Sequence, residues 1–351
     1  MSAPLPPRRH TRTVNVGGVP IGGNSPLTVQ SMTTARDAAG ILAQIRACAE
    51  RGGNFIRVAL PAMRDVPLFA AVVKESPLPV VADIHFDWRL ALAAVQAGAA
   101  KIRINPGNIN DWDGLRQVLS GAAARQIPIR IGVNSGSIKA ADAARLSETL
   151  VAEALNYATR FEEYGFHDIV LSLKSSSVPE TVAVNRAVAA RCDYPLHLGV
   201  TEAGLPEDAL LKSAVALGAL LGDGIGDTLR VSFTGEPAEE IDAGWKILRA
   251  AGICRDRPEL ISCPTCGRTR QPDLAALARE LRGALAKIRR PLTVALMGCE
   301  VNGPGEAARA DIGLAAAANG FWLFVKGKKI RLLPRPTAIA ELLAAMEQIA
   351  D

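Results

Sequence analysis

Three of the chain's six cysteines have the spacing of metal ligands. Cys263 and Cys266 end a C-x-x-C tetrapeptide, and Cys299 follows an apolar run and precedes a glycine-rich segment, residues 302–306. Thiolates are soft ligands, which zinc and iron–sulfur clusters prefer. A structural zinc ion normally takes a fourth Cys or His, but the last of the four histidines is His197, far upstream. The pattern therefore offers three soft ligands and no nitrogen.

Glu306, which ends the glycine-rich segment, is the nearest suitable oxygen ligand. Three cysteines and one exchangeable carboxylate would hold a cluster and leave one iron available for a substrate, which is the configuration of a catalytic centre. Two alternatives remain open at this point. One is a redox dithiol formed by Cys263 and Cys266, and the other is a zinc site that Glu306 or water completes.

Basic side chains lie at the ends of short apolar runs in the first part of the chain: Arg57, Arg103, Arg130, Lys174 and Arg230. Cations that gather at one place repel one another unless an anion binds there. Arg also presents a fork of donors that matches phosphate oxygens. We therefore expect a binding site for an anion, with a diphosphate favoured over a single carboxylate.

Further polar residues occupy the same run ends: Asp83, His85, Asn105, Asn134, His197, Glu202 and Ser232. We count them with the cations as candidate site residues. Asp83 and Glu202 are the candidates for proton transfer, because a carboxyl group can exchange a proton with a bound substrate. For His85 and His197 a supporting or packing role is the alternative to substrate binding.

Short runs rich in β-formers carry these residues, at positions 27–32, 54–60, 79–84, 100–105, 128–133, 168–174, 195–200 and 228–233. Between them lie Ala- and Leu-rich stretches with helical spacing, so we expect parallel strands joined by helical crossovers. Eight such units predict an α/β fold of the (β/α)₈ TIM-barrel type, in which chemistry occurs where the strands end. An open doubly wound sheet is the alternative.

The length of 351 residues exceeds what one hydrophobic core normally supports. We expect a substrate-binding barrel domain over residues 1–255, with an added glycine-rich hairpin at residues 13–26. A smaller α+β domain is expected over residues 256–351, with a Cys-bearing loop, a helix, a strand, a hairpin and a final helix.

Composition limits the partners. The net charge of +5 permits an anionic substrate without requiring nucleic acid. A nucleic-acid-binding module is one alternative, but its basic run lacks interleaved aromatic residues, which favours a solvated face: Lys326, Lys328, Lys329 and Arg331. The longest apolar stretch, residues 214–222, is too short to span a membrane, and the basic N-terminal segment has no apolar stretch behind it. We therefore expect a cytoplasmic protein without a membrane partner.

Seven motifs, in chain order, point to one family. They are VADIHFD (81–87), RINPGNI (103–109), IRIGVNSGS (129–137), PLHLGVTEAG (195–204), GDGIGDTLRVSFTGEP (222–237), CPTCGRT (263–269) and MGCEVNGPGEA (297–307). Over residues 13–313 the chain resembles the bacterial 4-hydroxy-3-methylbut-2-enyl diphosphate synthases, the iron–sulfur enzymes of the methylerythritol phosphate route to isoprenoids.

The resemblance implies a barrel followed by a [4Fe–4S] domain related to those of sulfite and nitrite reductases. It also implies a homodimer in which the cluster domain of one chain caps the barrel of the other. The implied reaction is the two-electron reductive ring opening of 2-C-methyl-D-erythritol 2,4-cyclodiphosphate with loss of water, and the implied electron donor is flavodoxin or ferredoxin.

The resemblance also assigns residues by motif match. Cys263, Cys266, Cys299 and Glu306 would hold the cluster, and Glu202 would be the barrel carboxylate at the reacting centre. The residues that would bind the diphosphate are Arg57, Arg103, Arg130, Asn134, Lys174, Arg230 and Ser232.

Three positions depart from the family pattern. Glu300 places a second carboxylate beside Cys299, where it could alter the potential of the cluster or compete weakly with Glu306 as a ligand. Ser177 replaces an acidic or amide residue. Residues 314–318 are poor in glycine, which we expect to stiffen the turn before the final hairpin. A non-redox barrel enzyme of the pterin-binding type, with a zinc-stabilised tail, is the main alternative.

Overall fold

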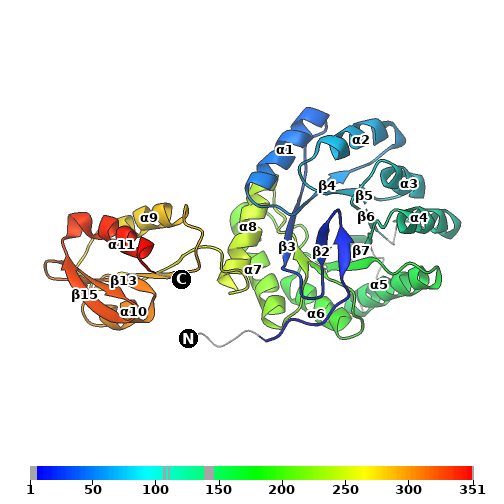
Figure 1. Cartoon of the computed structure of the whole chain (residues 1–351). Coiled ribbons are helices and arrows are strands. Elements are labelled where there is room, and N and C mark those ends of the chain that lie inside the picture. Colours follow the sequence, from blue (N-terminus) through cyan, green and yellow to red (C-terminus); the bar gives the residue numbers. More distant parts are fainter. Residues whose placement is uncertain (1–5, 106–107, 110, 138–145, 350–351) are drawn as a thin grey trace. The chain divides into compact units, whose positions relative to one another are not determined.

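The computed structural model describes residues 6–105, 108–109, 111–137 and 146–349. The chain forms two compact units, Met1–Ile253 and Cys254–Asp351. Figure 1 shows the first as helices arranged around a sheet and the second as a smaller sheet with helices. Each unit has its own hydrophobic core, so each is described separately.

The first unit contains a parallel sheet of eight strands: β3 (Thr28–Met32), β4 (Phe55–Ala59), β5 (Val80–Ile84), β6 (Lys101–Ile104), β7 (Ile129–Asn134), β8 (Ile169–Lys174), β9 (His197–Leu198) and β10 (Thr228–Leu229). Their order in the sheet is β8-β7-β6-β5-β4-β3-β10-β9. A parallel bridge between Leu171 and Leu196 joins the two end strands. The predicted (β/α)₈ barrel is thereby confirmed, and the open sheet is wrong.

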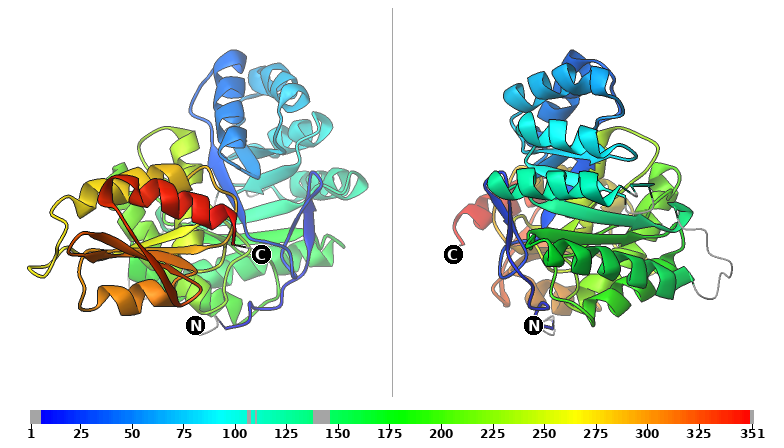
Figure 2. Two further views of the ribbon diagram at one scale, coloured as in Figure 1. Left: turned by 60° about the vertical axis from the view of Figure 1, so that its left-hand side comes forward. Right: turned by 90° about the vertical axis from the view of Figure 1, so that its right-hand side faces the viewer.

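Helices cover the outside of the barrel (Figures 1 and 2): α1 (Ala38–Glu50), α2 (Val66–Glu75), α3 (Trp88–Gln96), α4 (Trp112–Ala124), α5 (Leu146–Glu163), α6 (Val178–Ala189), α7 (Pro206–Gly222) and α8 (Pro237–Ala250). Short 3₁₀ turns lie at η1 (Met63–Asp65) and η3 (Ser135–Ser137). Several helices begin at a side chain that accepts a backbone N–H of the first turn, as N-caps do: Asp37, Asp87, Asp111 and Ser177. Ser177, one of the departures from the family pattern, therefore serves as the N-cap of α6.

The interior of the barrel contains polar side chains where branched apolar residues are usual. Gln30, Lys101, Arg130 and His197 are each at most 1% exposed. One end of this interior is closed by the predicted hairpin, β1 (Val14–Val16) and β2 (Val19–Ile21), because its apolar side chains pack against Phe55 and Val81.

The segment before this hairpin is bonded across the β9 and β10 region. The Arg9 guanidinium donates to the carbonyl oxygens of Ala189, Cys192 and Tyr194. The Thr11 hydroxyl donates to Asp227 at 3.1 Å, and the other oxygen of that carboxylate accepts the backbone N–H of Leu196 at 2.8 Å.

The second unit is a five-stranded sheet in the order β11-β12-β13-β14-β15. Its strands are β11 (Glu259–Ser262), β12 (Thr293–Met297), β13 (Ile312–Ala317), β14 (Gly320–Val325) and β15 (Lys328–Leu333). Its helices are α9 (Leu274–Leu285), α10 (Gly303–Arg309) and α11 (Ala338–Glu347), and η5 (Arg335–Thr337) precedes the last. Figure 2 shows α9 and α11 together on one side of this sheet and α10 on the other.

The expected turn before the hairpin is confined to residues 318–319, and its extension over residues 314–317 is wrong. Residues 312–317 form β13, which pairs in parallel with β12 and antiparallel with β14. All six of its residues are buried, so the small apolar side chains fit a strand that is covered on both faces. The low glycine content of this segment therefore belongs to the middle of a sheet.

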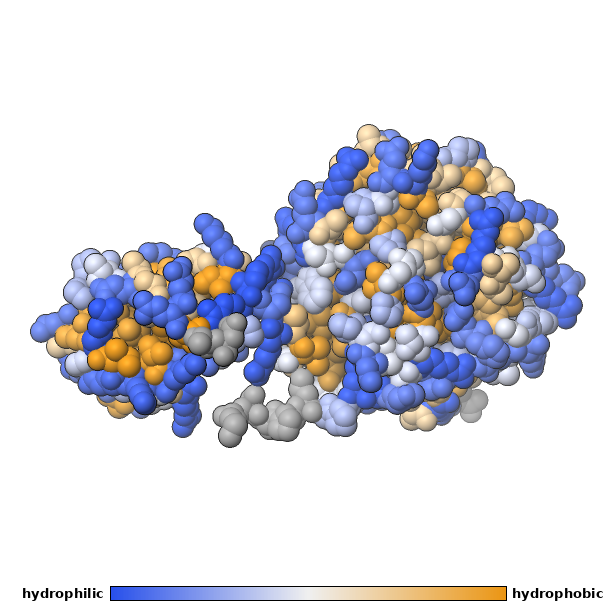
Figure 3. Space-filling view, viewed as in Figure 1, coloured by the Kyte–Doolittle hydropathy of each residue, from blue (hydrophilic) through white to orange (hydrophobic). Residues whose placement is uncertain are grey.

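Among the helices of the described residues, none is both long enough and apolar enough to cross a membrane. Figure 3 shows hydrophilic side chains distributed over the visible face of both units, with hydrophobic areas between them.

Candidate active site

A cavity of about 150 Å³ lies at the carboxyl ends of the barrel strands. It is lined by Arg57, Asp83, His85, Arg103, Arg130, Asn134, Ser172, Lys174, Thr201, Arg230 and Ser232. Strand register explains the convergence, because Asp83 pairs with Arg103 and Arg103 with Arg130. All five predicted cations are among the lining residues, so the structure brings them together as expected.

Asp83 is the carboxylate at the centre of this group. Its oxygens accept from Arg103 at 3.1 Å and contact His85 at 3.1 Å, and Arg57 lies at 3.9 Å. Burial alone would raise the pKa of Asp83, but the positive charge of Arg57, the His85 hydrogen bond and the charge of Arg103 hold it well below its ordinary value. Asp83 therefore stays ionised and orients these neighbours, which argues against a role as proton donor.

Arg230 is positioned by a different carboxylate. Glu240 on α8 accepts from Arg230 Nε and Nη2, both at 2.9 Å, and also from the Ser31 hydroxyl at 2.7 Å. Glu240 is 2% exposed. This two-pronged contact fixes the plane of the guanidinium at the cavity.

Arg130 and Lys174 line the cavity without a carboxylate of their own among the ion pairs of the described residues. Burial, together with the charge of Arg57 and other cations, lowers the pKa of both groups well below their ordinary values. Arg130 Nε and Nη1 have no hydrogen-bond partner in the described part of the chain. Buried donors without partners are costly, so the cavity is suited to an anion that accepts from them.

Three predicted site residues are not among those lining this cavity. Asn105 is buried, and residues 106–107 of its motif lie outside the described residues. His197 is fully buried in the barrel interior, where Nδ1 contacts Thr228 Oγ1 at 3.4 Å. Glu202 is exposed in the loop after β9 and has a φ of 52°, a left-handed backbone that is strained for a non-glycine residue.

Sequence reasoning missed Ser172 and Thr201, which line the cavity. Strand alternation could have found Ser172, because it lies two residues before Lys174 and therefore points to the same face. Glu240 was also missed, since nothing in a helical stretch marks which acidic residue turns inward.

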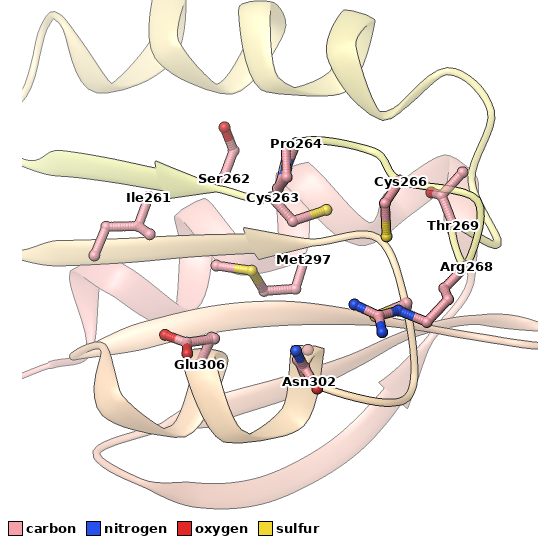
Figure 4. A pocket seen from close by; sticks show the side chains of 12 residues that line it. Ile261, Ser262, Cys263, Pro264, Cys266, Arg268, Thr269, Met297, Asn302 and Glu306 are labelled. Carbon is pink, nitrogen blue, oxygen red and sulfur yellow. The ribbon is translucent and has the colours of Figure 1, made fainter.

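The second unit contains a cavity of about 380 Å³, shown in Figure 4. Its lining includes all four predicted cluster ligands, Cys263, Cys266, Cys299 and Glu306, together with Arg268. In Figure 4 the Cys263 and Cys266 sulfurs lie on the loop after β11, and Glu306 lies across the cavity on α10. Two segments far apart in the sequence thus bring the motif residues to one cavity.

The backbone around the cysteines favours thiolates. The N–H groups of Asn302, Val301 and Gly303 at the start of α10 lower the pKa of Cys299. A hydrogen bond from the Arg268 backbone, aided by the positive charge of that side chain, lowers the pKa of Cys266. Cys263 Sγ accepts the Gly298 N–H at 3.2 Å.

The residues on the walls of this cavity have the chemistry of iron–sulfur cluster ligands. Among the described residues, no group of three His, Cys, Asp or Glu side chains converges closely enough to hold one ion. In a polynuclear cluster each ligand binds its own iron, so the ligands stand around a space. The observed cavity with three cysteines on its walls has this arrangement.

The two carboxylates near Cys299 are directed differently. Glu306 lines the cavity, and its nearest ion-pair partner is Arg309 at 3.8 Å. Glu300 is not among the lining residues, because its Oε1 accepts the backbone N–H of Ala318 at 3.0 Å and its Oε2 faces Arg270 at 4.0 Å. This arrangement therefore does not favour competition between Glu300 and Glu306 as ligands in the cavity.

Curated relatives match the chain over nearly its full length. A protein named 4-hydroxy-3-methylbut-2-en-1-yl diphosphate synthase (flavodoxin) from Geobacter sulfurreducens is 46% identical over 345 residues, covering 97% of this chain and 98% of the relative. A protein of the same name from Nocardia farcinica is 45% identical over 357 residues, covering 100% of this chain and 92% of the relative.

Solved structures agree on the barrel. A truncated 3-deoxy-D-arabino-heptulosonate 7-phosphate synthase from Thermotoga maritima has a TM-score of 0.52 at 13% identity and covers 69% of this chain and 94% of its own. A Yersinia pestis dihydropteroate synthase gives 0.51 at 10% identity, with 70% and 100% coverage. At such identities the likeness concerns the fold alone.

Family models match both units. The GcpE TIM-barrel domain matches residues 11–245, and the GcpE protein C-terminal domain matches residues 259–348. With the near full-length relatives, these matches show that the chain belongs to the GcpE family.

Proposed function

We propose that this chain converts 2-C-methyl-D-erythritol 2,4-cyclodiphosphate to 4-hydroxy-3-methylbut-2-enyl diphosphate in isoprenoid precursor biosynthesis. The conversion breaks a ring carbon–oxygen bond, expels a hydroxyl group as water, and consumes two electrons and one proton. The observation that carries the proposal is that one chain holds both a cationic barrel cavity and a cavity lined by three cysteines and a glutamate. Relatives that match almost the whole chain are named for the synthase of that product.

In this proposal the diphosphate binds to the barrel cations, with Arg57 and Arg103 held by Asp83 and with Arg230 held by Glu240. Arg130 and Lys174 supply buried donors, and Asn134 and Ser232 add polar contacts at the same cavity. Oriented cations of this kind bind phosphate oxygens and stabilise negative charge as it develops on the leaving oxygen.

Cys263, Cys266, Cys299 and Glu306 would hold a [4Fe–4S] cluster. Bound there, the cluster would supply the two electrons one at a time, from flavodoxin or ferredoxin as donor. Glu202 is the proposed proton donor to the departing hydroxyl, because it is the exposed carboxylate in the loop after β9. The His85 contact to Asp83 suits a supporting role, and Asn105 and His197 are buried but are not among the residues that line the cavity.

We further propose a homodimer, which light scattering of the purified protein tests. The cysteines must be reduced to act as ligands, which supports a reducing compartment such as the cytoplasm.

The experiment is anaerobic purification followed by iron, sulfide and zinc analysis and an assay with the cyclodiphosphate. We expect a brown protein with four irons per chain that forms the linear diphosphate with reduced flavodoxin or with dithionite. A colourless, iron-free and active preparation would overturn the proposal. Stoichiometric zinc without iron would instead favour the non-redox barrel enzyme.

A further inference from the structure

Lys101 is a buried cationic residue that the proposed reaction does not use. It is the first residue of β6 and is 0% exposed. Its Nζ has no hydrogen-bond partner among the residues that the structure describes. The contact recorded for this amine is the ring of Phe55, whose centroid lies 4.9 Å away.

The Lys101 amine lies within the barrel interior, with other groups on either side of it along the strands. Phe55 belongs to the apolar cluster in which Val16 and Ile21 of the hairpin close the barrel. Toward the cavity, Arg103 lies two residues further along β6, on the same face of the strand as Lys101, and it pairs in register with Arg130 on β7. Lys101 therefore lies between the apolar cluster of the hairpin and the cavity-lining residues Arg103 and Arg130.

Among the described residues, the charged and titratable groups around Lys101 offer it no counter-ion. Arg57 from β4 and Arg130 from β7 act on it as like charges, and His197 from β9 is a further titratable neighbour. The carboxylate on the adjacent strand β5, Asp83, is already engaged by other side chains: Arg57, His85 and Arg103.

An ammonium group in this position would be strongly disfavoured. The cost of desolvating the ammonium group exceeds what a single cation–π contact with Phe55 returns. Burial, followed by the charges of Arg130 and Arg57, accordingly lowers the pKa of Lys101 well below its ordinary value. The free barrel therefore disfavours the charged form of this residue.

Arg130 connects Lys101 to the cavity. It lines the cavity, is 1% exposed, and leaves Nε and Nη1 without partners among the described residues. When an anion binds to Arg130, the potential at Lys101 becomes less positive, and the main repulsion against charging Lys101 is offset.

We propose that Lys101 is a positioning residue that takes up a proton when a diphosphate binds at the barrel cavity. The bound anion then gains a further positive charge, which acts through Arg130 and is disfavoured in the free protein. This inference rests on the proposed diphosphate site. It adds a dependence of anion affinity on pH that the five basic residues lining the cavity do not by themselves predict.

The test is the affinity of the full-length holoprotein for inorganic pyrophosphate, measured by titration calorimetry between pH 6 and 10. Wild type is compared with Lys101→Met, which keeps the volume and removes the titrating group. Lys74→Met, at an exposed position on α2, is the matched control. Titration of pyrophosphate and of Lys174 affects all three proteins, so the ratio of affinities isolates Lys101.

We expect wild type and Lys101→Met to bind equally at the alkaline end. As the pH falls, wild type should gain affinity over the variant by up to tenfold per pH unit, while Lys74→Met follows wild type. A ratio that stays constant across the range assigns Lys101 a packing role and overturns the linkage. Failure of wild type to bind pyrophosphate at any pH overturns the diphosphate site itself, and the linkage with it.

A second measurement does not depend on the variant's folding. In wild type labelled with ¹³Cε-lysine, one buried resonance should sit at the neutral-amine position at pH 8 and move to the ammonium position when pyrophosphate is added, in addition to the response of Lys174. If no second lysine resonance moves, the proposal is wrong.

Discussion

Glu240 on α8 accepts two hydrogen bonds from Arg230, one through each carboxylate oxygen and both at 2.9 Å, and its side chain is buried at 2% exposure. A helix outside the barrel thus orients a side chain inside its mouth. Breaking such a buried pair from one side leaves a charge without compensation.

Glu240→Gln should therefore lower the free energy of unfolding by about 3 kcal/mol and weaken pyrophosphate binding. Urea unfolding and calorimetry measure the two effects. Glu239→Gln, on the same helix but exposed, should change neither. Wild-type stability in Glu240→Gln would show that the pair contributes nothing net.

Gly298→Ala should impair cluster loading. A Cβ at this position would lie 2.7 Å from Thr269 Oγ1, 2.9 Å from Leu274 Cδ2 and 3.2 Å from Cys263 Sγ, so the first two side chains must shift and the cysteine sulfur must be displaced slightly. We expect less than half the iron of wild type after reconstitution, measured by iron analysis and visible absorbance. Gly305→Ala is the control, because a Cβ there meets nothing within 4 Å. Equal iron in all three proteins would contradict the expectation.

Asp83 should make stability depend on pH at the acid end. Its pKa is depressed in the folded protein, so its contribution is complete above the unfolded-state value of about 3.9 and is lost as the pH falls toward the folded value. Asp83→Asn should be less stable than wild type by about 3 kcal/mol at pH 7, and the gap should narrow below about pH 4.

Urea unfolding of both proteins at several pH values measures this gap. Asp113→Asn serves as the comparison, because that carboxylate is 93% exposed and should give no pH-dependent difference. If the difference in free energy of unfolding between wild type and Asp83→Asn stays constant down to pH 3, the lowered pKa of Asp83 is not its source.

Glu306 and Glu300 test the assignment of the fourth cluster ligand. Glu306→Ala should retain part of the cluster and lose at least nine-tenths of turnover, because the carboxylate lines the cavity. Glu300→Ala should keep both, because its side chain bonds the Ala318 backbone instead. Iron content and dithionite-driven turnover distinguish the two. Full activity in Glu306→Ala would exclude a role for this carboxylate.

The barrel was predictable because its signals are local. Apolar runs with breakers mark the strands, and the ends of parallel strands meet at one edge, so Arg57, Arg103 and Lys174 could be grouped from sequence. The cysteine motifs are similarly local, since C-x-x-C and Cys299 each sit at a strand end.

The rest depends on contacts between distant segments. Whether Lys101 has a counter-ion depends on side chains from other strands of the barrel. The carboxylate partner of Arg230 comes from α8, the next helix in the chain. β13 was missed because its Ala-rich sequence has little intrinsic preference for a strand, and pairing on both edges determines its conformation.

The barrel is joined most thinly at β9 and β10, which are two residues long, and at the single bridge from Leu171 to Leu196. Arg9 and Thr11 hydrogen-bond to the segments that precede β9 and β10, so the N-terminal segment helps to hold this part of the barrel together. Amide exchange should open here before it opens anywhere else in the barrel. Deleting the residues up to and including Thr11 should therefore destabilise β9, the strand that precedes the Glu202 loop. Glu202 lies beyond the opposite end of that strand from the deleted segment.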